Sequence, residues 1–139
     1  MKYGYSSDIK GAKASGKEVQ VSPKKSYELA NAIRGKPLAK AKKYLEQVIA
    51  LEVPVPFKRY DNNVPHRRGM AAGRYPVKVA KAFLTIIKSA EANATALAMA
   101  KDKLKVAHIS VNLGRPIIGR RKGGAYNKST TNIQVILGE

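Results

Sequence analysis

The chain of 139 residues fits one domain with a single core, because a domain usually takes about 100–200 residues. Its 27 Lys and Arg against 9 Asp and Glu give a formal net charge of +18, so we expect a polyanionic partner, nucleic acid before an anionic membrane. The absence of cysteine excludes disulfides and thiolate metal sites, and no run of about 20 apolar residues could cross a bilayer.

The N-terminal segment is predicted to be a basic arm. Residues 1–16 are rich in Gly, Ser and Lys, a composition typical of a segment that is flexible or ordered by a partner. This segment lacks the apolar run of a secretion signal, so we expect a cytoplasmic protein. The next run, KEVQVSP, alternates Val19 and Val21 with polar residues and predicts a short strand.

Two short helices are predicted next. Ser22 and Pro23 indicate a helix start, since Ser caps free amides and Pro suits the first turn, and Gly35 indicates its end. Pro37 opens the second helix. The apolar positions are Leu29, Ala30 and Ile33 in the first helix and Leu38, Ala41, Leu45 and Val48 in the second.

Residues 52–75 show no regular period and are rich in Pro, Gly and Asn, so we expect a long functional loop. The loop cations are Lys58, Arg59, Arg67, Arg68 and Arg74. Arg suits phosphate through its bidentate fork, although a solvated charge cluster without a partner is the alternative interpretation. Tyr60 and Tyr75 would either stack on unpaired bases or pack within the loop.

The longest helix is predicted over residues 77–100. Its apolar stripe consists of Ala80, Phe83, Leu84, Ile87, Ala90, Ala94 and Leu97. Lys81 and Lys88 are seven residues apart and share a face, with Lys78 nearby. These lysines would either bind nucleic acid or form the solvated face of an amphipathic helix.

Residues 104–138 are predicted to form an extended antiparallel hairpin. Its alternating apolar residues are Ala107, Ile109, Val111 and Leu113, followed by Ile133, Val135 and Leu137. Gly123 and Gly124 supply the turn, and arms of about 40 Å are too long for so small a domain to cover, so the hairpin should protrude. The cations near its tip are Arg115, Arg120, Arg121, Lys122 and Lys128. They would bind nucleic acid or, alternatively, prevent edge-to-edge aggregation.

The sequence shows no catalytic constellation. His66 and His108 have no visible carboxylate orienter or nucleophile, the acids are scattered, and no phosphate-cradling glycine motif occurs. We therefore expect no enzyme, no cofactor and no metal site. Two other function classes stay open: a protein that coats DNA, and a nucleic-acid-processing enzyme, which would need a metal-binding acid cluster or a base with a nucleophile.

Four stretches carry a family resemblance. RGKPLAKAKKYL, KAFLTIIKSAEANA, LKVAHISVNLGRP and NIQVIL occur in this order, with the long basic loop after the first. Together they resemble ribosomal protein twenty-two of the large subunit, over about Val19 to Leu137. The stretch VPVPFKRYDNNV, followed by GRYPVKVAKAFL, is similar to the archaeal and eukaryotic branch of that family.

The resemblance implies an α+β fold with three helices packed on a small antiparallel sheet and a long protruding basic β-hairpin. It implies a structural protein that binds large-subunit ribosomal RNA, supports assembly and lines the peptide exit tunnel with its hairpin. Arg120, Arg121 and Lys122 would lie on RNA or the tunnel wall, and the loop cations would anchor the globular part. The implied partners are this RNA, neighbouring ribosomal proteins and the nascent peptide near the tip, without membrane insertion or homo-oligomerisation. The link between Leu113 and Ile133 is several residues shorter than is usual in the family.

Overall fold

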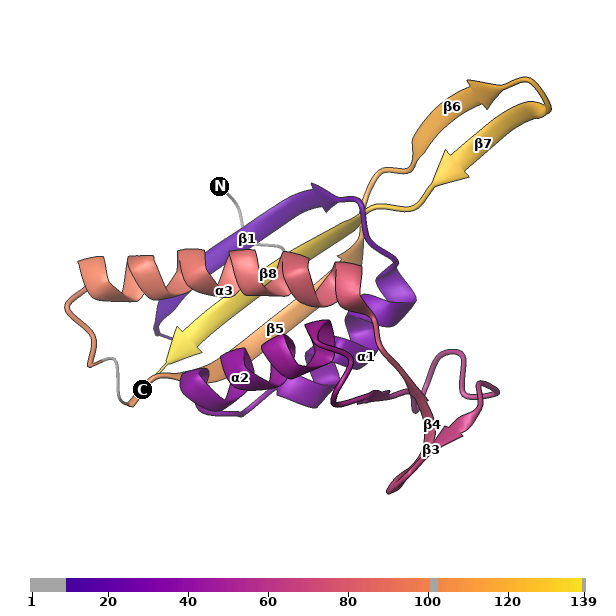
Figure 1. Ribbon diagram of the computed structural model, residues 1–139. Helices are drawn as coiled ribbons and strands as arrows, with labels where there is room; N and C mark the ends of the chain where they lie inside the picture. The colour runs from indigo at the N-terminus through magenta and orange to yellow at the C-terminus, as the bar shows by residue number, and fades with distance from the viewer. Residues whose placement is uncertain (1–9, 101–102, 139) are drawn as a thin grey trace.

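The computed structural model describes residues 10–100 and 103–138, except the side chain of Arg121. Its main sheet is antiparallel, with strands in the order β1–β8–β5 (Figure 1). These strands are β1 (Ala12–Val19), β5 (Lys105–Leu113) and β8 (Thr131–Gly138). The helices α1 (Pro23–Ile33), α2 (Leu38–Ile49) and α3 (Val77–Ala96) cover one face of the sheet. The predicted α+β class is confirmed.

The hydrophobic core lies between the helices and the sheet. β8 is the central strand, and its inward side chains Ile133, Val135 and Leu137 are fully buried. Phe83 and Ile87 of α3 are fully buried against them in the same core. Burying one such side chain stabilises the fold by about 1.5–3 kcal/mol, so this layer holds the sheet and helices together.

The two short helices follow their predicted signals closely. α1 begins at Pro23 and ends at Ile33, and Gly35 adopts the left-handed conformation with φ of +76°. Ser22 occupies the N-cap position, but its hydroxyl makes no capping bond; its carbonyl oxygen instead accepts from the Ser26 amide at 2.9 Å. All the predicted apolar positions of α1 and α2 are buried.

The predicted N-terminal arm is wrong where it overlaps β1. Residues 1–9 lie outside the described part of the chain, but Ala12 and Ala14 are buried and pair with Leu137 and Val135 of β8. Alanine is small and only weakly apolar, so the alternation of buried Ala12 and Ala14 with polar residues gave little indication of a strand in the sequence. The strand therefore starts earlier than expected, and Val19 is its last residue.

The long basic loop contains regular structure that was not predicted. A small antiparallel sheet has the strand order β2–β4–β3. Its strands are β2 (Val55–Pro56), β3 (His66–Arg67) and β4 (Met70–Arg74). We call residues 66–74 the prong, because the hairpin of β3 and β4 projects from the body of the molecule (Figure 1). Strands of two to five residues are too short to show a period.

Three apolar assignments near element ends are wrong. α3 ends at Ala96, so Leu97 falls outside it and is 61% exposed. In β5 the pairing shifts between Val106 and His108, so Val106 is buried in place of the predicted Ala107. A bulge adds one residue and reverses which side chains face the core. Leu113 is also exposed, at the end of the strand.

The predicted hairpin is present and is divided into two parts. β5 and β8 pair in the main sheet, while β6 (Ile117–Arg121) and β7 (Gly124–Lys128) pair with each other and project from the body (Figure 1). Between the parts, the Gly114 amide donates to the Thr130 carbonyl at 2.9 Å. The buried Thr130 hydroxyl donates to the Arg115 carbonyl at 2.6 Å. These bonds fix the base of the projecting arm.

Candidate nucleic-acid interface

The projecting arm carries its predicted cations on the surface. The exposed ones are Arg115, Arg120, Lys122 and Lys128, and the Arg121 side chain lies outside the described residues. The ring of Tyr126 packs over Gly119 on the paired strand, and the Lys128 ammonium lies 5.5 Å from the ring centroid. Ile118 is 72% exposed. A two-stranded ribbon with so little buried apolar area is marginal in water, so a partner is expected to hold it.

The prong presents Arg67, Arg68 and Arg74 as exposed side chains. The Arg67 guanidinium lies 5.5 Å from the centroid of the Tyr75 ring, and the stem of Arg67 packs on Gly73. Tyr75 therefore packs within the loop, one of the two roles considered for it. The effect is to hold the Arg67 guanidinium at a set place on the surface.

A buried acid that sequence analysis missed anchors the start of the basic loop. Glu28 of α1 is 1% exposed, and its Oε1 accepts from the backbone amides of Arg59 at 2.9 Å and Tyr60 at 2.8 Å. Its Oε2 accepts from the Lys58 amide at 3.2 Å. Hydrogen bonds to a charged acceptor are about twice as strong as neutral ones. One carboxylate thus fixes the backbone that carries Lys58 and Arg59.

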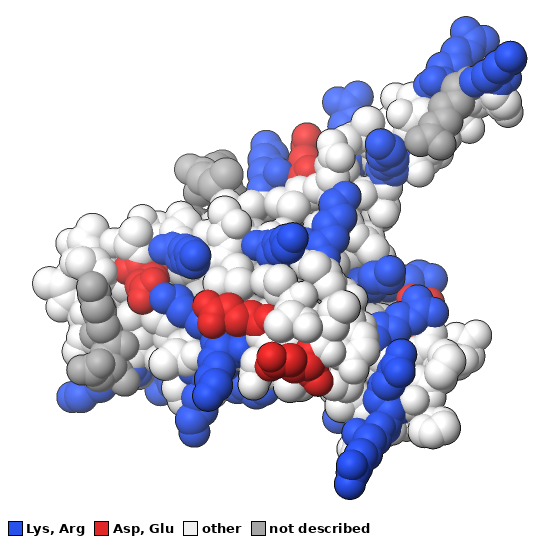
Figure 2. All heavy atoms as spheres, in the orientation of Figure 1, with Lys and Arg blue, Asp and Glu red and all other residues white. Residues whose placement is uncertain are grey.

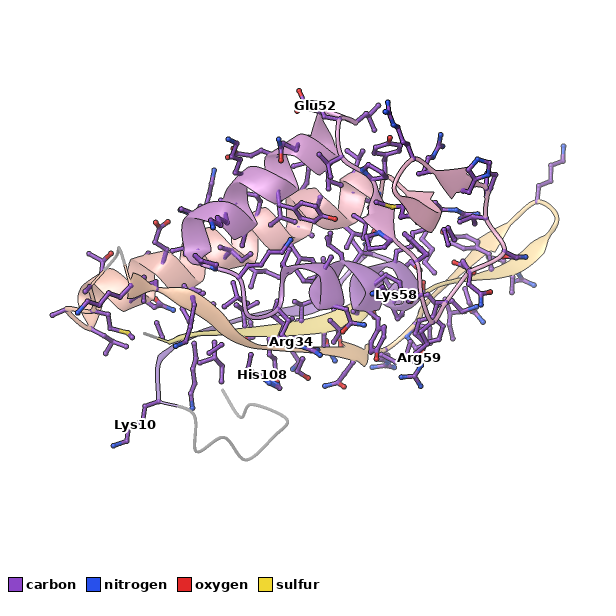
Figure 3. All side chains as sticks on the ribbon, turned by 90° about the horizontal axis from the view of Figure 1, so that it is seen from below. Lys10, Arg34, Glu52, Lys58, Arg59 and His108 are labelled. Carbon is purple, nitrogen blue, oxygen red and sulfur yellow. The ribbon has the colours of Figure 1, made fainter. Side chains whose placement is uncertain are left out.

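Arg59 is further held by two tyrosines. Its guanidinium carbon lies 5.2 Å from the centroid of the Tyr27 ring and 5.3 Å from that of Tyr60, and its Nη1 donates to the Tyr27 hydroxyl at 3.2 Å. The two rings meet edge to face, with centroids 5.4 Å apart. The hydrogen bond from Arg59 lowers the pKa of Tyr27, because a nearby cation favours the phenolate. Figure 3 labels Lys58 and Arg59 at the end of the molecule from which the arm projects.

The structure brings cations of three elements together at the base of the arm. Lys78 of α3, Lys128 of β7 and Lys25 of α1 line one open groove of about 370 Å³. Lys25 was not among the predicted site residues, because only the tertiary fold places it beside the others. Lys81 and Lys88 are exposed further along α3 and do not line this groove.

The predicted cations are not neutralised by acids that the structure describes. In Figure 2 blue groups lie on the arm and the prong, and over α2 and α3 blue and red groups are mixed. Lys42 of α2 forms an ion pair with Glu91 of α3. The predicted cations whose side chains the structure describes form no ion pair with a described acid. Their charge is therefore available to an anionic partner.

The described residues provide neither a cluster of metal ligands nor a membrane-spanning helix. They contain no group of three or more His, Asp or Glu side chains that could hold a metal ion. None of the helices in this part of the chain has the length and apolar character that a membrane span requires. His66 is exposed in β3, and His108 lies on the side of the main sheet away from the helices (Figure 3).

Comparison with known families identifies the chain. The family described as ribosomal protein L22p/L17e matches residues 14–138. The chain belongs to this family. A relative in Methanococcoides burtonii, named large ribosomal subunit protein uL22, is 43% identical over 92% of this chain and 89% of its own length. Relatives of the same name in Ignicoccus hospitalis and Methanopyrus kandleri are 42% and 43% identical, over 97% and 95% of this chain and 96% and 89% of their own lengths.

Membership of the L22p/L17e family confirms the resemblance found in the sequence, including its archaeal and eukaryotic branch, because all three relatives are archaeal. It also confirms the expectation of a structural ribosomal protein that is not an enzyme. The matched residues span the main sheet, the helices, the prong and the arm, so every cationic surface described above lies within the family fold.

Proposed function

We propose that this chain is a structural constituent of the large subunit of cytoplasmic ribosomes and binds large-subunit ribosomal RNA mainly through phosphates. The observation that carries the proposal is a set of cations on the arm, the prong and the base of the arm that form no ion pair with any acid the structure describes. A-form RNA hides its base edges in a narrow groove, so a protein holds it by phosphates, 2′-hydroxyls and unpaired bases. Its relatives are named as proteins of the large ribosomal subunit, and a cationic surface of this kind suits an assembly that contains RNA.

The proposed RNA-binding residues fall into three groups with different tasks. Lys58, Arg59, Arg67, Arg68 and Arg74 anchor the globular part; Lys78, Lys81 and Lys88 extend this surface along α3; Arg115, Arg120, Arg121, Lys122 and Lys128 hold the arm. Because the three groups face different directions, each would bind a different segment of RNA. By holding these segments together, the protein would support assembly of the large subunit. The exposed face of α2, which holds none of these residues, would face neighbouring proteins or solvent.

The arm is proposed to pass inward through RNA and line the peptide exit tunnel, with the nascent peptide passing near Lys122. Its geometry supports this role, because β6 and β7 project as a narrow ribbon whose two-residue turn is Lys122 and Gly123. Its exposed Ile117 and Ile118 would then be covered by RNA or by neighbouring proteins.

Salt dependence of RNA binding tests the proposal. With about 8–10 phosphate contacts, affinity of the full chain for large-subunit RNA should fall with a log–log slope of several units. Replacing Arg67 and Arg68 by Gln should reduce that slope by about one unit per lost contact. Replacing the exposed Lys40 and Lys43 of α2 by Gln should leave it unchanged. Binding that is insensitive to salt, or equal losses in both variants, would exclude the proposal.

A further inference from the structure

A second open groove lies beside the lysine-lined groove at the base of the arm, and its lining is aromatic and apolar. Tyr27 of α1, Tyr60 of the loop before β3, and Val111 and Leu113 of β5 line about 480 Å³ of space, with Lys24 at the margin. We call it the tyrosine groove. Its size lies within the range of about 300–1,000 Å³ that is usual for small-molecule sites.

The arrangement of the rings limits what can fit. The planes of the Tyr27 and Tyr60 rings meet at an angle of 84°, so the two rings form walls nearly at right angles to each other. A flat aromatic group that stacks on one ring presents its edge to the other, and both contacts are favourable geometries. Leu113, which is 71% exposed, adds an apolar contact at the same site. A base in a duplex already has both faces stacked, so only an unpaired base could enter.

The charges around the groove favour a nucleotide over an apolar protein side chain. Arg59 contacts both tyrosine rings, and the exposed Lys24 lines the groove, whereas none of the acids in the described part of the chain does. A base inserted here therefore has cations within reach of its own phosphates. Glu28 holds the Tyr60 backbone amide, so that wall is in place before any ligand arrives.

We infer that the tyrosine groove takes one unpaired RNA base, stacked on Tyr27 or Tyr60, with the adjoining phosphates on Lys24 and Arg59. This rests on the proposed RNA-binding function and adds to it a site for single-stranded RNA beside the phosphate-binding surfaces. Aromatic stacking accepts any base, so the groove selects unpaired nucleotides without reading their sequence.

The test compares two probes on the purified full-length chain: a short single-stranded oligouridine and a blunt RNA duplex of the same length. Tyr27→Leu and Tyr60→Leu should each weaken oligouridine binding by about 5- to 100-fold and leave duplex binding unchanged. Tyr27→Phe and Tyr60→Phe keep the rings and should bind oligouridine as the unsubstituted chain does. The Phe variant of Tyr27 also separates stacking from the lost hydrogen bond to Arg59.

Leu113→Ser tests the apolar wall of the groove at an exposed position. Its matched control is Leu97→Ser at the end of α3, because Leu97 is also exposed (61%) but does not line the groove. Only Leu113→Ser should weaken oligouridine binding. Equal losses on both probes, or no loss in the tyrosine variants, would overturn the inference and leave the groove to a protein side chain. If the unsubstituted chain bound neither probe, the proposed function itself would fail; if it bound both and the variants did not discriminate, the tyrosine groove alone would fail.

Discussion

Replacing Glu28 by Gln should loosen the basic loop without disturbing the rest of the core. The buried carboxylate accepts three backbone amides, two at Oε1 and one at Oε2. A Gln side chain can keep its oxygen toward Arg59 and Tyr60, but its NH₂ group then faces the Lys58 amide. One acceptor becomes a donor, so the part-buried Lys58 amide loses its partner at a cost of about 1–3 kcal/mol.

Glu28→Ala removes all three bonds and should cost more. If the three amides stayed buried, the loss would be about 3–9 kcal/mol, a large part of the about 5–15 kcal/mol that stabilises a typical domain. Because residues 58–60 can move toward water, we expect a loss near the lower figure, about 3 kcal/mol.

Urea denaturation measures the global loss, and hydrogen exchange at the amides of residues 58–60 shows where it arises. These three amides should exchange faster in Glu28→Gln than in the unsubstituted chain. Glu46→Gln, on the exposed face of α2, is the control and should change stability by less than about 0.5 kcal/mol. A Glu28→Gln variant with unchanged stability and unchanged exchange would refute the anchoring role of this carboxylate.

Three further substitutions test the fold. Leu51 follows α2 with φ of +65°, a conformation that favours glycine, and its amide and that of Glu52 close the end of the helix. Leu51→Gly should therefore raise the free energy of unfolding by about 0.5–1 kcal/mol, seen as a higher urea midpoint. A lower midpoint would contradict this. A Cβ at Gly11 would clash with the Leu137 carbonyl, so Gly11→Ala should cost about 1–3 kcal/mol in the same assay, and an unchanged midpoint would show that β1 is not held as described. A Cβ at Gly119 would clash with the Tyr126 ring, so Gly119→Ala should speed amide exchange in β6 and β7 only; its control Gly123→Ala, which meets open space, should not.

Local signals were sufficient for the two short helices and for the existence of the arm. Pro23 and Gly35 marked the ends of α1 to within two residues, because capping and left-handed closure depend on neighbouring residues alone. The turn of the arm was predicted at Gly123 and Gly124 and lies one residue earlier, at Lys122 and Gly123, while Gly124 begins β7 with a positive φ of +116°.

Features set by distant parts of the chain could not be predicted. The pairing of β1 with β8 joins opposite ends of the sequence, and the shift after Val106 depends on how β5 aligns with β8. In the candidate interface, the excess of Lys and Arg in the sequence was enough to predict that these cations lie on the surface. The contact between Glu28 and the 58–60 amides, and the placing of Lys25 beside Lys78, arise only when α1 packs near the loop and the arm.

Crosslinking from the tip of the arm in intact large subunits tests the central claim most directly. With a photoreactive residue in place of Lys122, we predict crosslinks mainly to large-subunit ribosomal RNA and, in translating ribosomes, to the nascent peptide. The same residue in place of Lys43 on α2 should give far less RNA crosslinking. A tip at position 122 that crosslinks to no RNA, or no more than position 43 does, would contradict the proposed placement of the arm.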